Sequence, residues 1–377
     1  MKQFVLIVFL VLSGFLNAQQ NISSSFVFQD STRTFTIYVP QKYLDNPSVA
    51  VPLLLNLHGY GSENWQQEFY GNFLPIADVE NFIICHPNGT KNDIGLRYWN
   101  AGFGAAAVDD VGFLSALIDT ISAKYSINAQ KVFSTGMSNG GFMSYTLACE
   151  LPNKIKKIAS VTGSMTKFQY ANCTNQNPIP VLQIHGTNDP TVNYNGNATT
   201  EAIEKVVGFW VNHNNCDSTF VESAIPNINM TDNSTVIRYD FNTSCDDNAE
   251  VVFYKVENGG HTWPGSEYLI PGDVTNLDFN ASEVIWKFFC PESPLLGINN
   301  IINDTEINVF PNPSTSFVNI ELKGNNQLLK VEVYQTNGQL VLQENKFKID
   351  ISSLEQGIYF LKIFTQKGIS NQRIFKF

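Results

Sequence analysis

The chain has 377 residues, enough for two or three domains, and its hydrophobic content of 43% allows each domain to bury a core. Only 15% of the residues are charged, which excludes a collagen, a coiled coil and a long disordered tail. The net charge of −11 argues against a nucleic-acid binder and a basic membrane-surface protein, because phosphate groups attract clustered Lys and Arg. An acidic, soluble surface is the simplest interpretation.

The first 18 residues are typical of a secretory signal. A short basic start, Met1–Gln3, precedes an almost wholly apolar run from Phe4 to Phe15, and Ala18 puts a small residue before Gln19. The apolar run is shorter than the ~20 residues that a membrane span needs. We therefore expect residues 1–18 to be a signal peptide and the remainder of the chain to be exported.

Export makes the six cysteines candidates for disulfide bonds. The sequence contains no Cys-x-x-Cys pair and no histidines at zinc-finger spacing from a cysteine, so we expect no metal site. Several connectivities are open. Pairing neighbours along the chain gives Cys149–Cys173 and Cys216–Cys245, which leaves Cys85–Cys290 as the third pair.

Between Phe35 and Cys290, short apolar runs alternate with helical patterns. The expected strands are residues 51–57, 82–85, 131–135, 181–184 and 250–255. The expected helices are residues 110–125, 141–150, 199–213 and 281–289. This alternation predicts an α/β domain over residues 19–291, with a mostly parallel sheet and helices on both faces.

The pattern changes near the end of this region. Residues 292–304 lack periodicity and are expected to form a linker. From residue 305 to 377 only short alternating runs occur, with Gly-containing turn signals between several of them: residues 317–322, 329–334, 339–342, 347–351, 358–364 and 372–377. They predict a small all-β domain of the sandwich type.

The chemistry is expected in the first domain, where residues 136–140 form a Gly-x-Ser-x-Gly motif centred on Ser138. This motif alone is weak, and an ordinary Gly-rich turn is the alternative. Here a predicted strand leads into it and a predicted helix leads out, which is the strand–turn–helix of a nucleophile elbow. The serine then lies at a helix N-terminus, where developing negative charge is favoured. Ser138 is the candidate nucleophile.

A serine nucleophile needs a histidine base, and the order Ser–acid–His restricts the choice. Five histidines are available: His58, His86, His185, His213 and His261. The first two precede Ser138, the third precedes the expected acid, and the fourth ends a helix beside polar residues. The last lies in a Gly-rich loop after the last strand of the predicted sheet. His261 is therefore the candidate base.

Asp189 is the candidate acid, because it follows the buried strand 181–184 and would orient the base. Other aspartates compete from polar, loop-like sequence: Asp217, Asp240, Asp246 and Asp247. The oxyanion needs two backbone donors, for which we expect the amides of Asn139, after the nucleophile, and Tyr60, after an early strand. His58 would then be a structural support.

Two further features of the sequence need interpretation. Trp99 and Trp263 flank the expected cleft, where an aromatic ring stacks on a substrate ring or packs in the core. Asp109–Asp110 precedes a helix and is expected to cap it.

The motifs of the first domain, taken in order, resemble one family. They are Leu57-His58-Gly59-Tyr60-Gly61, Trp99-Asn100, Val108 to Phe113, Gly136 to Gly141, His185 to Asp189 and Gly260 to Gly265. Together they look like the secreted polyhydroxybutyrate depolymerase and feruloyl esterase family, over about residues 30–290. The resemblance implies an α/β-hydrolase esterase with Ser138, Asp189 and His261 as its triad and no cofactor. Tyr60-Gly61 departs from the loop of many members, which affects the second oxyanion donor and the acyl pocket.

The tail has its own resemblance. Asn308 to Pro313, Tyr334 to Gln339, Leu354 to Tyr359 and Arg373 to Phe377 look like the C-terminal sorting domain of type IX secretion. A carbohydrate-binding or fibronectin-like module is the alternative. The resemblance implies a secreted or cell-surface protein that meets outer-membrane secretion machinery through residues 305–377.

The combined hypothesis is a secreted serine esterase acting on feruloyl or acetyl esters of plant cell-wall polysaccharide. A polyhydroxyalkanoate depolymerase or short-chain esterase is the first alternative. A serine peptidase and a non-catalytic surface binding protein are remoter ones.

Overall fold

The computed structural model describes residues 20–104, 108–266, 268–292, 307–323, 327–335, 340–365 and 368–377. The chain divides into two compact units, Met1–Ile285 and Trp286–Phe377. The division falls within its last helix, a few residues before the domain end that we predicted at 291. The predicted signal peptide lies outside the described residues, as does the predicted linker apart from its first residue. No helix in the described residues is long and apolar enough to cross a membrane.

A ten-stranded sheet organises the described part of the larger unit, in the order β1-β2-β4-β3-β7-β8-β9-β12-β11-β10. Its strands are β1 (Gln20–Phe28), β2 (Ser31–Val39), β3 (Val51–Leu57), β4 (Ile83–Pro87), β7 (Ile127–Met137), β8 (Lys157–Val161), β9 (Val181–Gly186), β10 (Val221–Ile225), β11 (Thr235–Phe241) and β12 (Val251–Glu257). The central strands from β4 to β12 pair in parallel. Antiparallel strands extend both edges. The mostly parallel sheet is confirmed.

The central strands are apolar because both faces of the sheet are covered. In β3 every residue except Pro52 is buried, and in β9 all are buried, so neither strand shows the alternation of a half-exposed sheet. Strands β5 (Thr90–Lys91) and β6 (Arg97–Tyr98) have two residues each and pair with each other as a separate small antiparallel hairpin.

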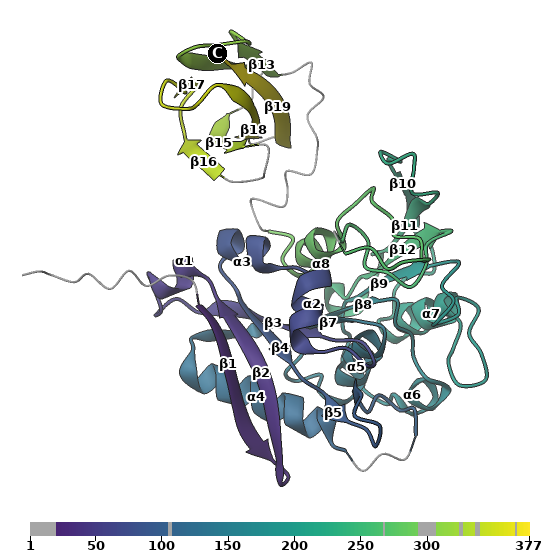
Figure 1. Cartoon of the computed structure of the whole chain (residues 1–377). Helices are drawn as coiled ribbons and strands as arrows, with labels where there is room; N and C mark the ends of the chain where they lie inside the picture. The colour runs from purple at the N-terminus through teal and green to yellow at the C-terminus, as the bar shows by residue number, and fades with distance from the viewer. Residues whose placement is uncertain are drawn as a thin grey trace, which may run out of the picture. The chain divides into compact units, whose positions relative to one another are not determined.

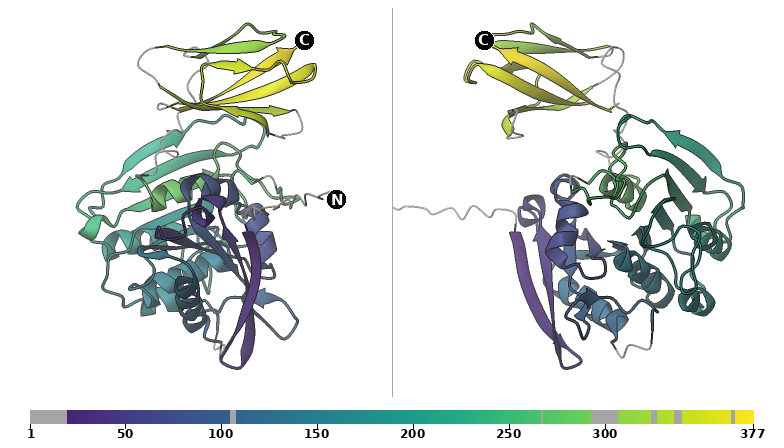
Figure 2. Two further views of the ribbon diagram at one scale, coloured as in Figure 1. Left: turned by 90° about the vertical axis from the view of Figure 1, so that its left-hand side faces the viewer. Right: turned by 45° about the vertical axis from the view of Figure 1, so that its right-hand side comes forward.

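Helices lie on both sides of this sheet (Figures 1 and 2). They are α1 (Gln41–Leu44), α2 (Asn64–Tyr70), α3 (Leu74–Glu80), α4 (Asp110–Lys124), α5 (Asn139–Glu150), α6 (Lys167–Asn172), α7 (Ile203–His213) and α8 (Ala281–Phe289). Residues of α4, α5 and α7 share one core cluster with alternate residues of β3, namely Leu53, Leu55 and Leu57. These three helices therefore cover the same face.

Two of the three predicted disulfides are present. Cys149–Cys173 joins the end of α5 to the end of α6, and Cys216–Cys245 closes a loop beside the antiparallel edge. The predicted pair Cys85–Cys290 is wrong. Cys85 is a fully buried free thiol within β4, and burial raises its pKa. The sequence pairs Cys85 with Cys290 only because they remain once neighbouring cysteines are paired. This elimination says nothing about where the two residues lie in the fold.

The smaller unit has two antiparallel sheets in its described residues, β13-β14-β17 and β16-β15-β18-β19. The strands are β13 (Ile307–Phe310), β14 (Phe317–Leu322), β15 (Leu328–Gln335), β16 (Leu340–Glu344), β17 (Lys348–Asp350), β18 (Gly357–Thr365) and β19 (Gly368–Lys376). Buried side chains from both sheets form one cluster, including Val318 and Ile349 from the first and Val331 and Leu361 from the second. This is the all-β arrangement predicted from alternation.

Candidate active site

The loops after three parallel strands carry the three predicted catalytic residues. Ser138 directly follows β7, Asp189 follows β9, and His261 follows β12. Within the parallel part of the sheet the order is β7-β8-β9-β12, so the carboxyl ends of all three strands share one edge. This edge is where open α/β sheets place their ligand sites.

Ser138 occupies a strained turn. Its backbone has φ 55° and ψ −119°, in a region that costs a non-glycine residue about 1–3 kcal/mol and occurs mainly at functional sites. The Ser138 amide donates to the Val161 carbonyl at 2.8 Å, and the Ser138 carbonyl accepts from the Phe142 amide at 3.0 Å. The end of β8 and the first turn of α5 therefore hold the serine in this conformation, as in a nucleophile elbow.

The two outer glycines of the motif are required by packing. A Cβ atom on Gly136 or on Gly140 would overlap the carbonyl oxygen of Leu57, the last residue of β3. The elbow and the end of β3 are thus in backbone contact. That contact explains the Gly-x-Ser-x-Gly pattern without any appeal to flexibility.

Asp189 and His261 form a direct pair. The distance from His261 Nδ1 to Asp189 Oδ2 is 2.8 Å, and the Asp189 side chain is fully buried. The other carboxylate oxygen accepts hydrogen bonds from the Thr191 and Val192 amides, both at 2.8 Å. These two donors fix the plane of the carboxylate. Because a carboxylate only accepts, His261 Nδ1 carries a proton toward it, and Nε2 is left to act as a base.

A second histidine supports the acid. His185 Nε2 lies 2.9 Å from the Val192 carbonyl and 3.4 Å from Asp189 Oδ2, while its Nδ1 accepts from Gln183 Nε2 at 3.1 Å. Nε2 therefore carries the proton. Burial lowers the pKa of His185, so the ring is neutral. Gln183 in turn accepts from the Tyr145 hydroxyl at 2.6 Å, which links α5 to the acid through buried groups. Sequence order excluded His185 as the base but did not suggest this supporting position.

The loop after β3 runs beside the nucleophile. A Cβ atom on Gly59 would lie 3.5 Å from Ser138 Cβ. The next amide is that of Tyr60, and the amide after Ser138 is that of Asn139. Neither amide donates to an acceptor within the described parts of the chain. The Asn139 amide directly follows Ser138 and the Tyr60 amide follows Gly59, so both remain the candidate oxyanion donors.

His58 is a structural residue, consistent with the support predicted for it. It is fully buried, its Nε2 accepts from the Gly89 amide at 2.9 Å, and its Nδ1 donates to the Gly59 carbonyl at 2.7 Å. Desolvation lowers the pKa of His58 to about 4, which keeps it neutral. The ring therefore anchors the loop that carries Tyr60 rather than acting as a second base.

Of the two interpretations open for Trp99 and Trp263, substrate contact and core packing, burial favours core packing. Trp99 is 1% exposed and Trp263 is 2% exposed. The Trp99 backbone is held by the Asn139 side chain, whose Oδ1 accepts at 2.6 Å and whose Nδ2 donates at 3.1 Å. The Trp263 indole donates to Ser282 Oγ at 3.2 Å. Both rings pack in the core, and the Trp99 backbone holds the side chain of Asn139, the residue after Ser138.

The acidic pair at the N-terminus of α4, the cap residue Asp109 and the first helical residue Asp110, is structural too. Asp109 caps the helix by accepting from the Gly112 amide at 2.7 Å, as expected. Asp110 is buried, pairs with Arg33 at 2.6 Å and accepts from the Asn100 amide at 2.7 Å. Desolvation raises the pKa of Asp110, and Arg33 opposes that rise. Asp110, held by Arg33, therefore fixes the backbone at Asn100, directly after Trp99.

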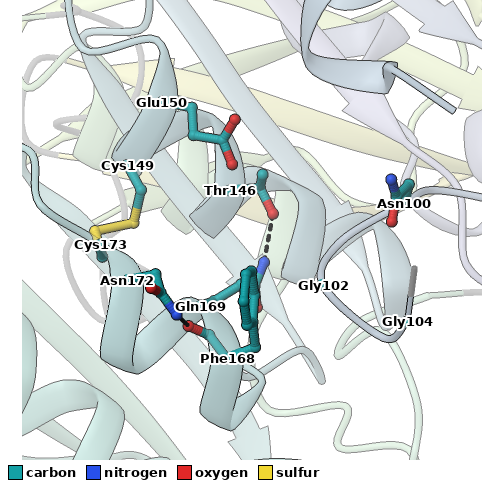
Figure 3. A pocket seen from close by; sticks show the side chains of 10 residues that line it. All are labelled: Asn100, Gly102, Gly104, Thr146, Cys149, Glu150, Phe168, Gln169, Asn172 and Cys173. Atoms are coloured by element: carbon teal, nitrogen blue, oxygen red, sulfur yellow. Dashed lines mark hydrogen bonds between the residues drawn. A yellow bond between two sulfur atoms is a disulfide. The ribbon is translucent and has the colours of Figure 1, made fainter. Parts of the chain in front are cut away.

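A hollow of about 180 Å³ lies at the other end of α5 (Figure 3). Thr146 and Glu150 of α5 and Gln169 and Asn172 of α6 line it, and Gln169 bonds Thr146 across its wall. Burial raises the pKa of Glu150. None of the three predicted catalytic residues lines this hollow. In the described residues, no group of His, Cys, Asp and Glu could hold a metal ion.

Comparison with known proteins agrees with this geometry. Residues 106–239 match the phospholipase/carboxylesterase family. The larger unit, which contains these residues, has an α/β-hydrolase-like fold with a mostly parallel sheet. Residues 308–376 match the secretion system C-terminal sorting domain, which is of type IX. That domain marks a secreted or cell-surface protein, and the match favours it over the carbohydrate-binding or fibronectin-like alternative.

Individual relatives are esterases. The α/β-hydrolase is 29% identical to a probable feruloyl esterase C of Aspergillus niger, over 52% of this chain and 67% of that protein. It is 26% identical to feruloyl esterase C of Emericella nidulans, over 70% and 86% respectively. It is 29% identical to a bifunctional acetylxylan esterase/xylanase of Neocallimastix patriciarum, over 44% of this chain and only 23% of that protein. Among solved structures, an acetyl xylan esterase from Aspergillus awamori aligns with a TM-score of 0.49 and 15% identity, over 64% of this chain and 94% of that one.

Proposed function

We propose that this hydrolase is a serine esterase in which Ser138, His261 and Asp189 form the catalytic triad. The observation that carries the proposal is the 2.8 Å pair between His261 Nδ1 and buried Asp189, in loops that end at the same sheet edge as the strained Ser138. Backbone strain of the kind found at Ser138 lowers stability and occurs mainly at functional sites. Together the pair and the strained serine prepare a base and a nucleophile for acyl transfer.

The proposed reaction has two steps. Ser138 Oγ attacks the ester carbonyl while His261 Nε2 takes its proton, and the same nitrogen then protonates the departing alcohol. Asp189 keeps the proton on Nδ1 and stabilises the imidazolium that forms. A water molecule, activated by the same nitrogen, then attacks the acyl-enzyme and releases the acid. The chain's own residues suffice for these steps.

Negative charge develops on the carbonyl oxygen of the ester, and the amides of Tyr60 and Asn139 would donate hydrogen bonds to it. Both belong to backbone that is fixed before substrate arrives: Gly61 donates to the Arg97 carbonyl at 2.8 Å, and the Asn139 side chain is bonded to Trp99. Fixed donors cost no reorganisation in the transition state, and one such donor contributes roughly 10²–10³ in kcat.

The favoured substrates are feruloyl or acetyl esters on plant cell-wall polysaccharide, as the names of the relatives suggest for those proteins. The test is hydrolysis of methyl ferulate, p-nitrophenyl acetate and p-nitrophenyl butyrate by the purified full chain, with Ser138→Ala as control. Release of ferulate that the variant abolishes would support the feruloyl assignment. Activity on the short esters alone would move the assignment to acetyl esters or a polyester, and silence on all three from folded protein would contradict the esterase.

A further inference from the structure

Three large aromatic side chains lie exposed beside one another. Trp65 and Phe69 of α2 are each 63% exposed, and Tyr268, in the loop that follows His261, is 50% exposed. The two α2 residues are four apart and so share one face of the helix. The rings of Phe69 and Tyr268 meet edge to face, with centroids 5.7 Å apart. We call these three residues the aromatic row. Contiguous exposed apolar surface of this kind marks a binding site more often than chance.

The aromatic row is connected to both halves of the proposed catalytic machinery. Helix α2 begins just after the loop that carries Tyr60, and the Tyr70 hydroxyl of α2 accepts from the Gly59 amide at 3.4 Å. On the other side, a Cβ atom on Gly71 would lie 3.3 Å from Trp263 Cη2 in the His261 loop. A substrate that reaches Ser138 between these loops therefore has the aromatic row beside it.

The row rests on a rigid support. Helix α2 starts with a reciprocal capping box between Glu63 and Gln66. Beneath it, fully buried Gln67 donates to Asn56 Oδ1 at 2.7 Å, and Asn56 Nδ2 donates to the Gly71 carbonyl at 2.9 Å. The helix that carries Trp65 and Phe69 is thus fixed at its first residue and at its end. Rings on a fixed backbone lose little entropy on binding.

The chemistry of the row indicates its occupant. A pyranose has flat C–H faces that pack on an aromatic ring and a rim of hydroxyls that need hydrogen-bond partners. A charged pair lies next to the row: Glu63 directly precedes α2, and its carboxylate accepts from Arg97 Nε at 2.9 Å. A flat ring with a polar border suits a sugar better than an aliphatic chain, which needs an enclosing apolar groove.

We infer that the aromatic row binds the polysaccharide chain that carries the ester, with successive sugars stacked on Trp65, Phe69 and Tyr268. The inference rests on the proposed function, because it takes the sugar side of the substrate to leave the Ser138 site along α2. It assigns the row to recognition of the polymer and gives it no part in the chemistry. Substrates without the polymer should therefore be indifferent to it.

The first test measures binding without catalysis. Full chains carrying Ser138→Ala are run through gels that contain arabinoxylan, alone or with Trp65→Ala, Phe69→Ala and Tyr268→Ala singly and together. Each single change should weaken retardation roughly 2- to 10-fold, and the triple change on the order of 30-fold. The matched control is Phe220→Ala, which removes another half-exposed ring, at the antiparallel edge near Tyr239, and should leave retardation unchanged.

Unchanged retardation of the triple variant, with thermal unfolding like that of the parent, would overturn the inference. So would row-dependent adsorption to polyhydroxybutyrate particles without any retention by arabinoxylan.

The second test separates this inference from the proposed function. In the Ser138 background, the triple change should lower kcat/KM on feruloylated arabinoxylan about tenfold or more and leave kcat/KM on methyl ferulate within about twofold. Equal losses on both substrates would show that the row supports the catalytic site and would overturn its assignment to the polymer. If no ester is hydrolysed but retardation still depends on the row, the proposed function fails and sugar binding by the row stands.

Discussion

Replacing Asp189 with Asn tests how the structure assigns the protons of the site. The amide side chain has nearly the same shape as the carboxylate but must choose an orientation. The Thr191 and Val192 amides, each 2.8 Å from Asp189 Oδ1, both donate and so hold the oxygen of the new amide toward themselves. Its NH₂ group then faces His261 Nδ1, where the Asp189 oxygen accepted at 2.8 Å.

A donor at that position forces the histidine into the other tautomer. His261 Nδ1 becomes the acceptor, Nε2 carries the proton, and Nε2 no longer takes a proton from Ser138. Loss of the correct tautomer costs about 10⁴ in kcat in the serine protease for which it is documented, and we expect roughly 10³–10⁴ here, about 4–5 kcal/mol in the barrier.

The assay is kcat on p-nitrophenyl acetate at pH 7 to 8, with thermal unfolding as the check on folding. Asp217→Asn is the matched control, since Asp217 is an exposed aspartate that also accepts from a backbone amide, that of Thr219 at 3.1 Å. It should keep full activity. If folded Asp189→Asn retains more than about a tenth of the parent kcat, the proton assignment is wrong.

Three further predictions concern stability. Gly140→Ala should destabilise the fold by about 2–4 kcal/mol in urea unfolding, because its Cβ would overlap the Leu57 carbonyl; a loss below about 0.5 kcal/mol would refute the packing argument. Cys149→Ala with Cys173→Ala should cost about 2–4 kcal/mol in the same measurement, since the bond closes a separation of 24 residues; an unchanged midpoint would contradict the bond. His58 has a folded pKa of about 4, below its ordinary 6.5, so its contribution is complete above pH 6.5 and is lost as pH falls toward 4. His58→Gln should therefore flatten the fall in melting temperature between pH 6.5 and 5, and an identical slope in parent and variant would argue against a neutral buried ring.

The placement of Ser138, Asp189 and His261 at one edge of the sheet could be predicted because it depends on chain order and on strand ends. The sequence signals for a buried strand, a Gly-rich turn and a following helix coincide at Ser138, and parallel strands bring successive loops to one edge. The predicted helix over residues 110–125 matches α4, and the strand at 51–57 matches β3.

What could not be predicted depends on side-chain direction and on long-range packing. Trp99 and Trp263 flank the right motifs, but spacing does not say whether a ring points inward. The edge strands β1 and β10 and the short helix α2 lack the continuous apolar run of a buried element, because edge strands and surface helices keep one side in water. Chain order excludes His185 as the base, and its position beside Asp189 follows only from the fold of residues 185–192.

The most direct test of the central claim is covalent labelling of the full chain with a fluorophosphonate, followed by mass spectrometry of the intact protein and of its peptides. Only a serine activated by a neighbouring base reacts readily with this probe. The account predicts one adduct per chain, located on Ser138, with no adduct on Ser138→Ala and a greatly slowed reaction in His261→Ala. An unlabelled but folded parent chain, or an adduct that persists on Ser138→Ala, would contradict it.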